Sequence, residues 1–191
     1  MKKAFYQSID MELNELKAEH RLRELRSPES LAGLINLSSN DYLGISRRQD
    51  WLSEFLDSAP ASDFAMSAVS SRLLTGNHQE YIELEESLSR FYNHRAALVF
   101  NSGYHANSGI LPALTGKGDL ILSDKLNHAS IIDGMKLSGA NYKRYQHLDY
   151  GNLEDQLRAT AGKYRRTVVI SESIFSMDGD IANLPELVRL K

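Results

Sequence analysis

Cysteine is missing from the 191-residue sequence, which excludes disulfide scaffolds, thiolate zinc sites and cysteine nucleophiles. Apolar runs are short: none approaches the roughly 18 residues that span a bilayer, and the N-terminus lacks the apolar stretch of a secretory signal. Basic residues do not dominate, because 22 Lys and Arg face 25 Asp and Glu, which gives a formal charge of −3. We therefore expect a cytoplasmic protein without a membrane segment and without a broad affinity for nucleic acid.

Proline is also scarce, at four residues, and neither repeats nor low-complexity tracts interrupt the chain. Hydrophobic residues make up 42% and charged residues 25% of the sequence, which is the composition of an ordinary globular protein. A chain of this length can bury a sizeable core, and it corresponds to one domain or to part of a larger one.

The first half of the sequence predicts helices separated by polar turns. Leucines at helical spacing predict an amphipathic helix from about Asp10 to Leu25, which the Ser27-Pro28 pair would end. A short strand is expected at residues 34–37, and further helices are expected at residues 51–56 and 78–92.

From residue 96 onward, short apolar runs alternate with helical patterns. Strands alternating with helices at this spacing favour an α/β fold around a largely parallel sheet with right-handed crossovers. The expected strands are residues 97–100, 120–122, 142–148 and 167–170, and the expected helices are residues 103–114, 129–137, 153–160 and 184–191.

Three polar segments follow predicted strands, at the sheet edge where open α/β folds bind ligands. In residues 101–104, Ser102 could cap the next helix, and Gly103 would let a phosphate approach the free N–H groups. His128 precedes another helix, where an imidazole could stack on a planar ligand, shuttle a proton or only cap the helix. Residues 171–180 gather carboxylates and hydroxyls in a turn that matches no metal-binding loop.

Several common chemistries have no support in the sequence. It contains no G-x-G-x-x-G dinucleotide fingerprint, no Walker loop, no H-E-x-x-H zinc pair and no G-x-S-x-G nucleophile elbow. The polar loop at residues 70–78 could be an anion-binding nest or only a helix cap. From the residues alone, we expect an α/β protein with a cleft for a phosphate-bearing ligand and no metal.

Four stretches stand in a fixed order along the chain: residues 36–44, 71–78, 126–130 and 174–180. Together they resemble the α-oxoamine synthase family of fold-type I pyridoxal-phosphate enzymes. The resemblance implies a three-layer α/β large domain with a mostly parallel sheet, incomplete at its C-terminus. It also implies an N-terminal helical segment at residues 1–34, followed at residues 35–191 by the first part of the domain that binds pyridoxal phosphate (PLP).

The resemblance implies pyridoxal 5'-phosphate as the cofactor and gives roles to the matching residues. Ser102, Gly103 and Tyr104 match the turn that holds the cofactor phosphate and flanks its ring. His128 matches the imidazole that stacks over the pyridine face, where we expect it to act in catalysis and to contact the substrate. Ser176 matches the hydroxyl that bonds the phenolic oxygen of the cofactor.

Substrate contacts are implied at three further residues. Asn40 falls in a stretch that lies near the amino-acid substrate in the family. The family also has an N-terminal arginine that contacts substrate, and Arg21 and Arg23 are both candidates. Members are homodimers with active sites at the subunit interface, so Asn40 or residues 71–78 could serve the neighbouring subunit. His78 belongs to a well-matched motif but receives no chemical role.

The family reaction is a decarboxylating Claisen condensation of an amino acid with an acyl thioester. The motifs are most similar to those of members that join L-alanine to pimeloyl-CoA, or to its acyl-carrier-protein equivalent, in biotin biosynthesis. Members that join glycine to acetyl-CoA are the first alternative within the family, and other α-oxoamine synthases are further ones.

Family members are about twice as long as this sequence, far above the size of one compact layer. Beyond the point where it ends, they carry an Asp-x-Ala-His motif and then the lysine that forms the Schiff base. We therefore expect the chain to be the N-terminal portion of the enzyme and to be inactive alone. The alternative from another class is a stand-alone, non-catalytic module that binds a partner or a phosphate ligand.

Overall fold

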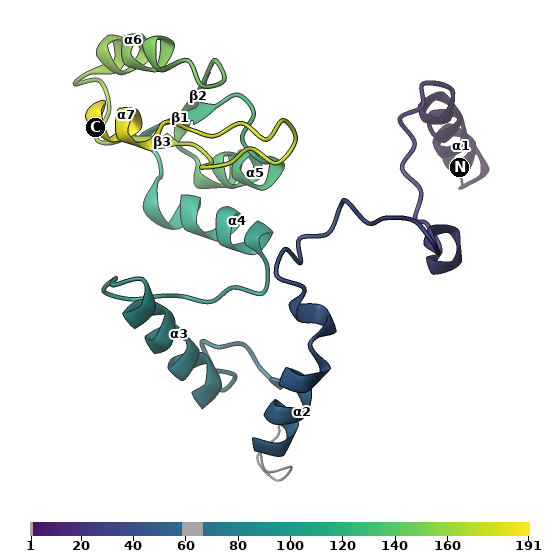
Figure 1. The fold of residues 1–191 in the computed structure, drawn as a ribbon. Helices are drawn as coiled ribbons and strands as arrows, with labels where there is room; N and C mark the ends of the chain where they lie inside the picture. The colour runs from purple at the N-terminus through teal and green to yellow at the C-terminus, as the bar shows by residue number, and fades with distance from the viewer. Residues whose placement is uncertain (1, 59–66) are drawn as a thin grey trace. The chain divides into compact units, whose positions relative to one another are not determined.

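The computed structural model describes residues 2–58 and 67–191. Its contacts divide the chain into two compact units, unit 1 at Met1–Met66 and unit 2 at Ser67–Lys191 (Figure 1). No helix in the described ranges is long and apolar enough to cross a membrane. The buried apolar side chains of these ranges lie in unit 2, so the packed core that can hold a site in place belongs to that unit.

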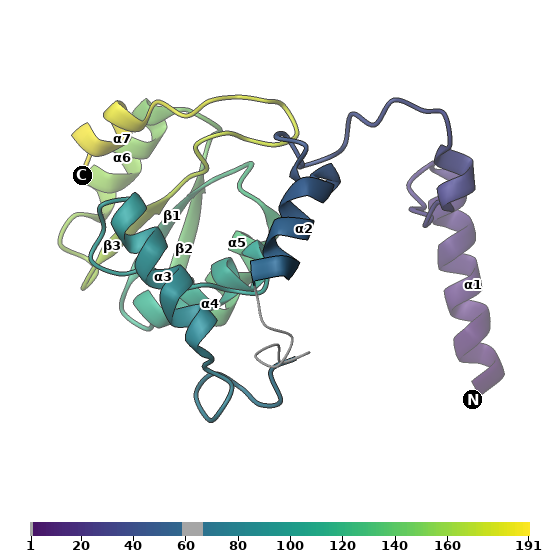
Figure 2. The same cartoon turned by 60° about the horizontal axis from the view of Figure 1, so that its bottom comes forward.

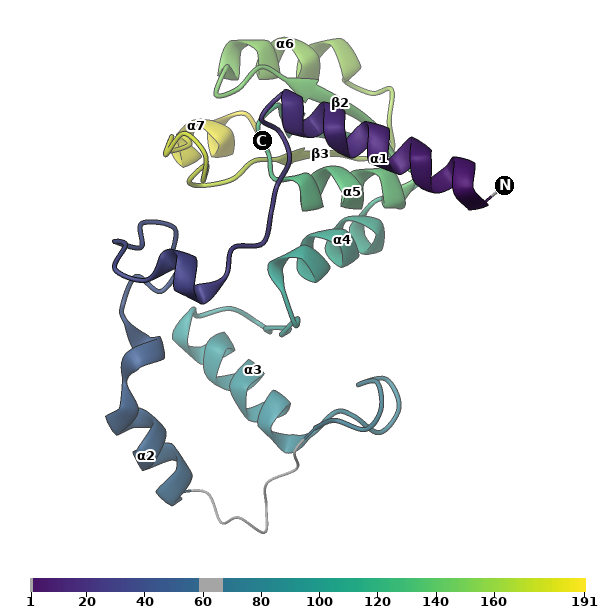
Figure 3. The same ribbon diagram turned by 90° about the vertical axis from the view of Figure 1, so that its right-hand side faces the viewer.

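Unit 1 is built from helices and turns, with its long first helix visible along its length in Figure 3. Its elements are helix α1 at Lys2–Ala18, the 3₁₀ turns η1 at Pro28–Leu31 and η2 at Ile45–Arg47, and helix α2 at Gln49–Ser58. The helix predicted at residues 51–56 is therefore confirmed as α2. The strand predicted at residues 34–37 is wrong, because the described part of unit 1 contains no partner strand.

Helix α1 ends earlier than the predicted helix. His20 has a left-handed backbone with a φ of 55°, and its N–H donates to the carbonyl oxygen of Lys17. The N–H of Arg21 donates to the carbonyl oxygen of Leu16, which completes the Schellman arrangement that ends many helices. The prediction extended too far because the leucine spacing continues past the residue at which the backbone turns.

Unit 2 alternates helices and strands (Figure 1). In chain order it contains α3 at Gln79–Phe91, α4 at Gly103–Leu114, β1 at Leu120–Asp124, α5 at Ala129–Ser138, β2 at Asn141–Tyr145, α6 at Tyr150–Thr160, β3 at Thr167–Ile170 and α7 at Leu184–Arg189. The helices lie where the periodicity predicted them, and α4 has both of its predicted bounds.

The three strands form a parallel sheet in the order β2-β1-β3. Leu122 of β1 is in register with Lys143 of β2 and with Val169 of β3. All five residues of β1 are buried, as expected of a central strand that is covered on both faces. The predicted α/β fold with a parallel sheet is thus confirmed.

Side chains of β1 alternate between two helical layers, which Figure 2 shows on opposite sides of the sheet. Ile121 packs in one cluster with Leu111 of α4 and Met135 of α5. Leu122 packs in the other cluster with Leu153 of α6 and with partly buried side chains of α7. Each fully buried aliphatic side chain contributes about 1.5–3 kcal/mol to stability, so β1 anchors both layers.

Two of the predicted strands of unit 2 differ from the structure. Residues 97–100 form no strand, since the N–H of Val99 donates to the carboxylate of Glu85 at 2.8 Å instead of to a neighbouring strand. The strand predicted at residues 142–148 is shorter, because β2 ends at Tyr145 and Leu148 adopts a φ of 53°. A positive φ cannot continue a strand.

Candidate active site

A hollow opens at the carboxyl edge of the sheet, beyond the ends of β1 and β3. Its walls come from the segment that follows β1 and from the segment that follows β3. The lining residues are Leu126, Asn127, His128, Ala129, Glu172, Phe175, Ser176, Met177 and Asp178. Two residues singled out from the sequence, His128 and Ser176, therefore line the same hollow.

His128 is the N-cap of α5, and its ring is fixed by hydrogen bonds at Nδ1. The N–H of Ser130 donates to Nδ1 at 3.1 Å, and the Ser130 hydroxyl lies 2.7 Å from the same atom. The hydroxyl oxygen accepts a hydrogen bond from the Asn107 amide of α4 at 2.9 Å, which directs the hydroxyl proton to the ring. Since Nδ1 accepts, the proton of the neutral imidazole lies on Nε2.

The backbone around His128 is tied to the segment after β3. The His128 N–H donates to the Glu172 carboxylate at 2.5 Å. The side-chain amide of Asn127 donates to Ser123 Oγ and to the carbonyl oxygen of Ile170, both at 2.9 Å, so it joins β1 to β3. The Asn127 Oδ1 atom is buried and accepts no hydrogen bond from the described residues.

Ser176 lies in a hairpin formed by residues 173–182. The N–H of Phe175 donates to the carbonyl oxygen of Asp180 at 2.9 Å, and Ala182 closes the hairpin with a bond to the Ser173 carbonyl at 3.0 Å. Phe175 is 2% exposed and packs edge-on against the His147 ring, whereas Ser176 is exposed. Ser176 therefore lines the hollow from a hairpin whose neighbouring residue, Phe175, is buried.

The turn at Ser102, Gly103 and Tyr104 begins α4 and contacts α5, but it does not line the hollow of His128 and Ser176. Ser102 caps the helix by accepting the N–H of His105 at 3.2 Å, which is one of the two roles that the sequence left open. The Tyr104 hydroxyl donates to the Asp133 carboxylate of α5 at 2.5 Å. This bond raises the pKa of Tyr104 and lowers the pKa of Asp133. It ties the first turn of α4 to the helix that His128 caps.

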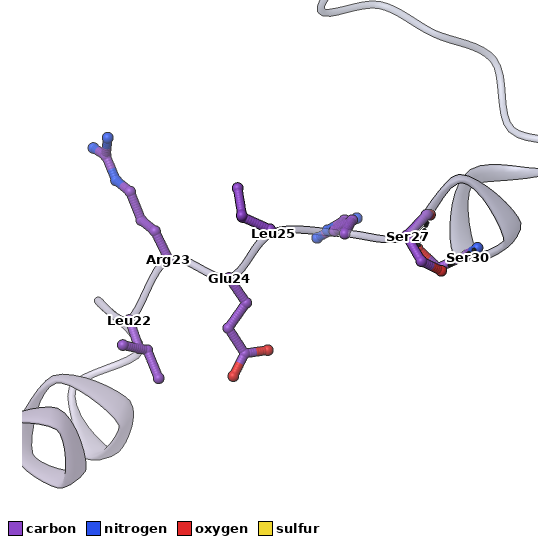
Figure 4. A pocket seen from close by; sticks show the side chains of 7 residues that line it. Leu22, Arg23, Glu24, Leu25, Ser27 and Ser30 are labelled. Atoms are coloured by element: carbon purple, nitrogen blue, oxygen red, sulfur yellow. Dashed lines mark hydrogen bonds between the residues drawn. The ribbon is translucent and has the colours of Figure 1, made fainter. Parts of the chain in front are cut away.

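The predicted substrate residues Arg21, Arg23 and Asn40 belong to unit 1. Arg21 pairs with Glu19 at 2.7 Å, and both side chains are exposed. Arg23 lies on a shallow hollow of unit 1, where its side chain and that of Glu24 point away from each other (Figure 4). Asn40 is exposed. Their contact with substrate stays a prediction.

Several residues at this edge were not predicted individually from the sequence. Glu172 and Asn127 stand in the segments after β3 and β1, so the strand-end rule could have found them. Asn107 lies in the middle of α4, and no sequence pattern pointed to its contact with Ser130. Within residues 2–58 and 67–191, no group of acidic or histidine side chains is arranged to hold a metal ion.

Curated relatives match the chain closely. The sequence profile of the family aminotransferase class I and II matches residues 32–191. 8-Amino-7-oxononanoate synthase of Chlorobaculum parvum is 50% identical over 196 residues, covering 96% of this chain and 50% of that protein. The Haemophilus ducreyi protein of the same name is 51% identical over 162 residues, covering 83% of this chain and 42% of that protein. The chain thus spans about half the length of the curated relatives it matches.

Solved structures give the same result. Serine palmitoyltransferase from S. paucimobilis, with bound PLP-myriocin aldimine, aligns with a TM-score of 0.71 and 34% identity, covering 78% of this chain and 37% of that chain. 8-Amino-7-oxononanoate synthase from Francisella tularensis aligns with a TM-score of 0.67 and 30% identity, covering 83% of this chain and 43% of that chain. The chain therefore belongs to the aminotransferase class I and II family and, within it, to the α-oxoamine synthases, whose cofactor is pyridoxal 5'-phosphate.

Proposed function

We propose that the protein containing this chain condenses L-alanine with a pimeloyl thioester, on CoA or on a carrier protein, to give 8-amino-7-oxononanoate for biotin biosynthesis. The observation that carries the proposal is the common hollow of His128 and Ser176 at the carboxyl edge of β1 and β3. The 50% identity to the C. parvum protein of that name supports the choice of substrates.

The residues of unit 2 fit a planar cofactor that bears a phosphate. His128 and Ser176 line the same hollow, so an imidazole and a hydroxyl border the space that a ring with a phenolic oxygen would fill. A Cβ built on Gly103 would meet no atom within 4 Å, so the first turn of α4 is open to a ligand. Unpaired N–H groups at such a helix N-terminus suit a phosphate.

When bound, pyridoxal phosphate supplies an electron sink that stabilises negative charge at the substrate carbon. Ser102, Gly103 and Tyr104 would hold its phosphate through the first N–H groups of α4. The Ser176 hydroxyl would donate to the phenolic oxygen. These contacts would fix the position of the ring before any substrate arrives.

His128 would cover one face of the cofactor ring. Its Nδ1 atom is occupied by Ser130, which leaves Nε2–H as the donor that can reach a substrate carboxylate. As the family resemblance implies, Arg21 or Arg23 would contact the substrate, and so would Asn40. These contacts would orient the amino acid relative to the cofactor.

The proposal is tested by assaying the intact protein with two substrate pairs. L-Alanine with pimeloyl-CoA or pimeloyl carrier protein should give 8-amino-7-oxononanoate, detected by mass spectrometry. Glycine with acetyl-CoA should give little product. Turnover with the glycine pair alone would replace the proposed function by that of a glycine C-acetyltransferase.

We also propose that the intact protein is a cytoplasmic homodimer and that residues 1–34 form a helical segment ahead of the cofactor domain at residues 35–191. The resemblance of residues 71–78 to the family motif supports a site shared between subunits. Light scattering on the intact protein measures the mass directly. A monomer that retains full activity would contradict the shared site.

A further inference from the structure

His147 lies between two carboxylates that belong to different segments. Its Nδ1 atom is 2.8 Å from Asp124 Oδ1, and its Nε2 atom is 3.1 Å from Asp180 Oδ2. The ring also meets the ring of Phe175 edge-on, with centroids 4.5 Å apart and an interplanar angle of 86°. The His147 side chain is 19% exposed, so these contacts enclose most of it.

Asp124 is the fixed end of this arrangement. It is the last residue of the central strand β1, and its side chain is fully buried. Besides His147, its carboxylate accepts the N–H of Leu126 at 2.8 Å and the N–H of Leu148 at 3.0 Å. Three donors from two segments therefore hold the carboxylate in one orientation at the sheet edge.

Asp180 and Phe175 are the partners of His147 on the other side, and both belong to the hairpin at residues 173–182 that carries Ser176. The Phe175 N–H donates to the Asp180 carbonyl oxygen, so the two residues face each other across the hairpin. The His147 imidazole thus contacts both arms of the hairpin and, through Asp124, the end of strand β1. The hairpin connects β3 to α7, and its residues 175–178 form one wall of the hollow.

We propose that His147 is a positioning residue that docks the Ser176 hairpin onto the carboxyl end of β1, so that Ser176 stays opposite His128. The inference rests on the proposed function only for the role of Ser176 in binding the cofactor, since the contacts of His147 with the hairpin do not depend on that role. Ionised carboxylates only accept hydrogen bonds, so the ring satisfies both of them when it carries a proton on each nitrogen.

Protonation of the imidazole should therefore strengthen the docking. Burial by itself lowers the pKa of His147, but the hydrogen bonds to Asp124 and Asp180 outweigh it and raise the pKa above the usual value. These two carboxylates, one from β1 and one from the hairpin, are the charged groups in contact with the ring. A raised pKa means that the stabilisation is present at lower pH and is lost as the pH rises through that pKa.

Hydrogen exchange on the intact protein tests the docking. In His147→Gln, the amides of Phe175, Gly179 and Ala182 should exchange about tenfold faster, the scale of one lost charge-assisted hydrogen bond, while those of β1 stay within about twofold. After correction for intrinsic rates, protection in the wild-type protein should fall as the pH rises, and it should be flat in the variant. His94→Gln, an exposed histidine of unit 2, is the matched control and should change nothing.

Asp180→Asn is the second variant, because its side chain is 47% exposed and its replacement leaves the core intact. It should loosen the same three amides, and adding His147→Gln should cause little further change. Equal protection in the wild-type protein and both variants would overturn the inference. Loss of protection in β1 as well would also overturn it, because the role would then be general stability.

Pyridoxal phosphate binding, followed by fluorescence, separates the two proposals. If the wild-type protein binds the cofactor, His147→Gln should raise the dissociation constant about tenfold and His94→Gln should not. Unchanged affinity with a loosened hairpin would refute the positioning role while the proposed function stood. If the wild-type protein binds no cofactor, the proposed function fails, and the exchange data alone decide whether His147 docks the hairpin.

Discussion

Asp119 is a fully buried carboxylate that two arginines share at the start of β1. Its oxygen lies 2.7 Å from Arg165 and 3.0 Å from Arg166, and the N–H of Gly116 donates to it at 3.0 Å. The hydrogen bonds from the two arginines hold the pKa of Asp119 well below its usual range. Since the arginines directly precede β3, the cluster fixes β1 and β3 at the edge opposite the hollow.

Asp119→Asn should destabilise unit 2, because it removes both ion pairs from a buried site. We expect the thermal midpoint to fall by roughly 5–10 °C. The lowered pKa means that the ionised carboxylate stabilises the fold above its unfolded-state pKa and loses this effect as the pH falls. The difference between variant and wild type in circular-dichroism melts should therefore shrink from about pH 7 to about pH 2. Asp155→Asn, exposed on α6, is the control, and an equal loss there would refute the mechanism.

Glu85 of α3 carries another carboxylate whose pKa is lowered. Arg72 binds it in a bidentate pair, at 2.7 and 3.0 Å, and the N–H of Val99 donates to it at 2.8 Å. The bonds from Arg72, and then that from Val99, lower the pKa of Glu85 to about 2. Through these bonds the loop of Arg72, the helix α3 and the segment at residues 96–100 share one carboxylate.

An NMR titration of the Glu85 side-chain carboxyl carbon should report that pKa of about 2. In Arg72→Met, the pKa should move back toward the usual glutamate value, because the largest cause of the shift is gone. The Arg72–Glu85 pair should stabilise the fold at a pH above the unfolded-state pKa of Glu85. This stabilisation should be lost as the pH falls toward 2. Glu83, an exposed residue of the same helix, is the internal reference in the spectrum. An unchanged Glu85 titration in Arg72→Met would contradict the assignment.

At the scale of elements, local signals predicted helices better than strands. Helix α4 carries its own start signal in Ser102, whose side chain bonds to the first turn, so its bounds follow from residues close in sequence. The apolar run at residues 97–100 predicts a strand equally well, but a strand exists only with a neighbour, and the described residues offer it none. Strand prediction from a short segment therefore fails where the segment itself does not show whether a neighbouring strand exists.

Gly134 determines how closely α5 packs against α4. A Cβ there would lie 2.5 Å from the carbonyl oxygen of Asn107 and 3.0 Å from Leu111. Because the backbone of α4 would have to move, Gly134→Ala should lower the free energy of unfolding by about 1–3 kcal/mol, despite alanine's better helix propensity. Asn107 also holds Ser130, so the ring of His128 should become less fixed.

Urea denaturation of Gly134→Ala measures the loss, with Gly109→Ala as the matched control. Gly109 lies in α4, where a Cβ would meet the Phe100 ring at an ordinary 3.5 Å. The control should be neutral or should stabilise the fold by up to about 1 kcal/mol. Similar losses in both variants would show that close helix packing is not the cause.

At the scale of the whole molecule, the candidate site was predictable only in part. Strand ends and family motifs singled out His128 and Ser176, because parallel strands end at one edge and bring their following segments together. The contacts that orient these residues, such as Asn107 with Ser130 and Asp124 with His147, join residues far apart in sequence. They follow from the packing of helices on the sheet, which no single segment encodes.

The distribution of the core also makes a prediction for the whole chain. Every buried apolar side chain in the described ranges lies between Leu111 and Ala182, within unit 2. A fragment of residues 67–191 should therefore unfold cooperatively, with a thermal midpoint within about 3 °C of the 191-residue chain. Removing residues 184–191 should lower the midpoint much more, because Leu187 and Leu190 pack on the cluster around Leu122. If loss of residues 1–66 lowered the midpoint as much as loss of α7, unit 1 would have to stabilise the core of unit 2 directly.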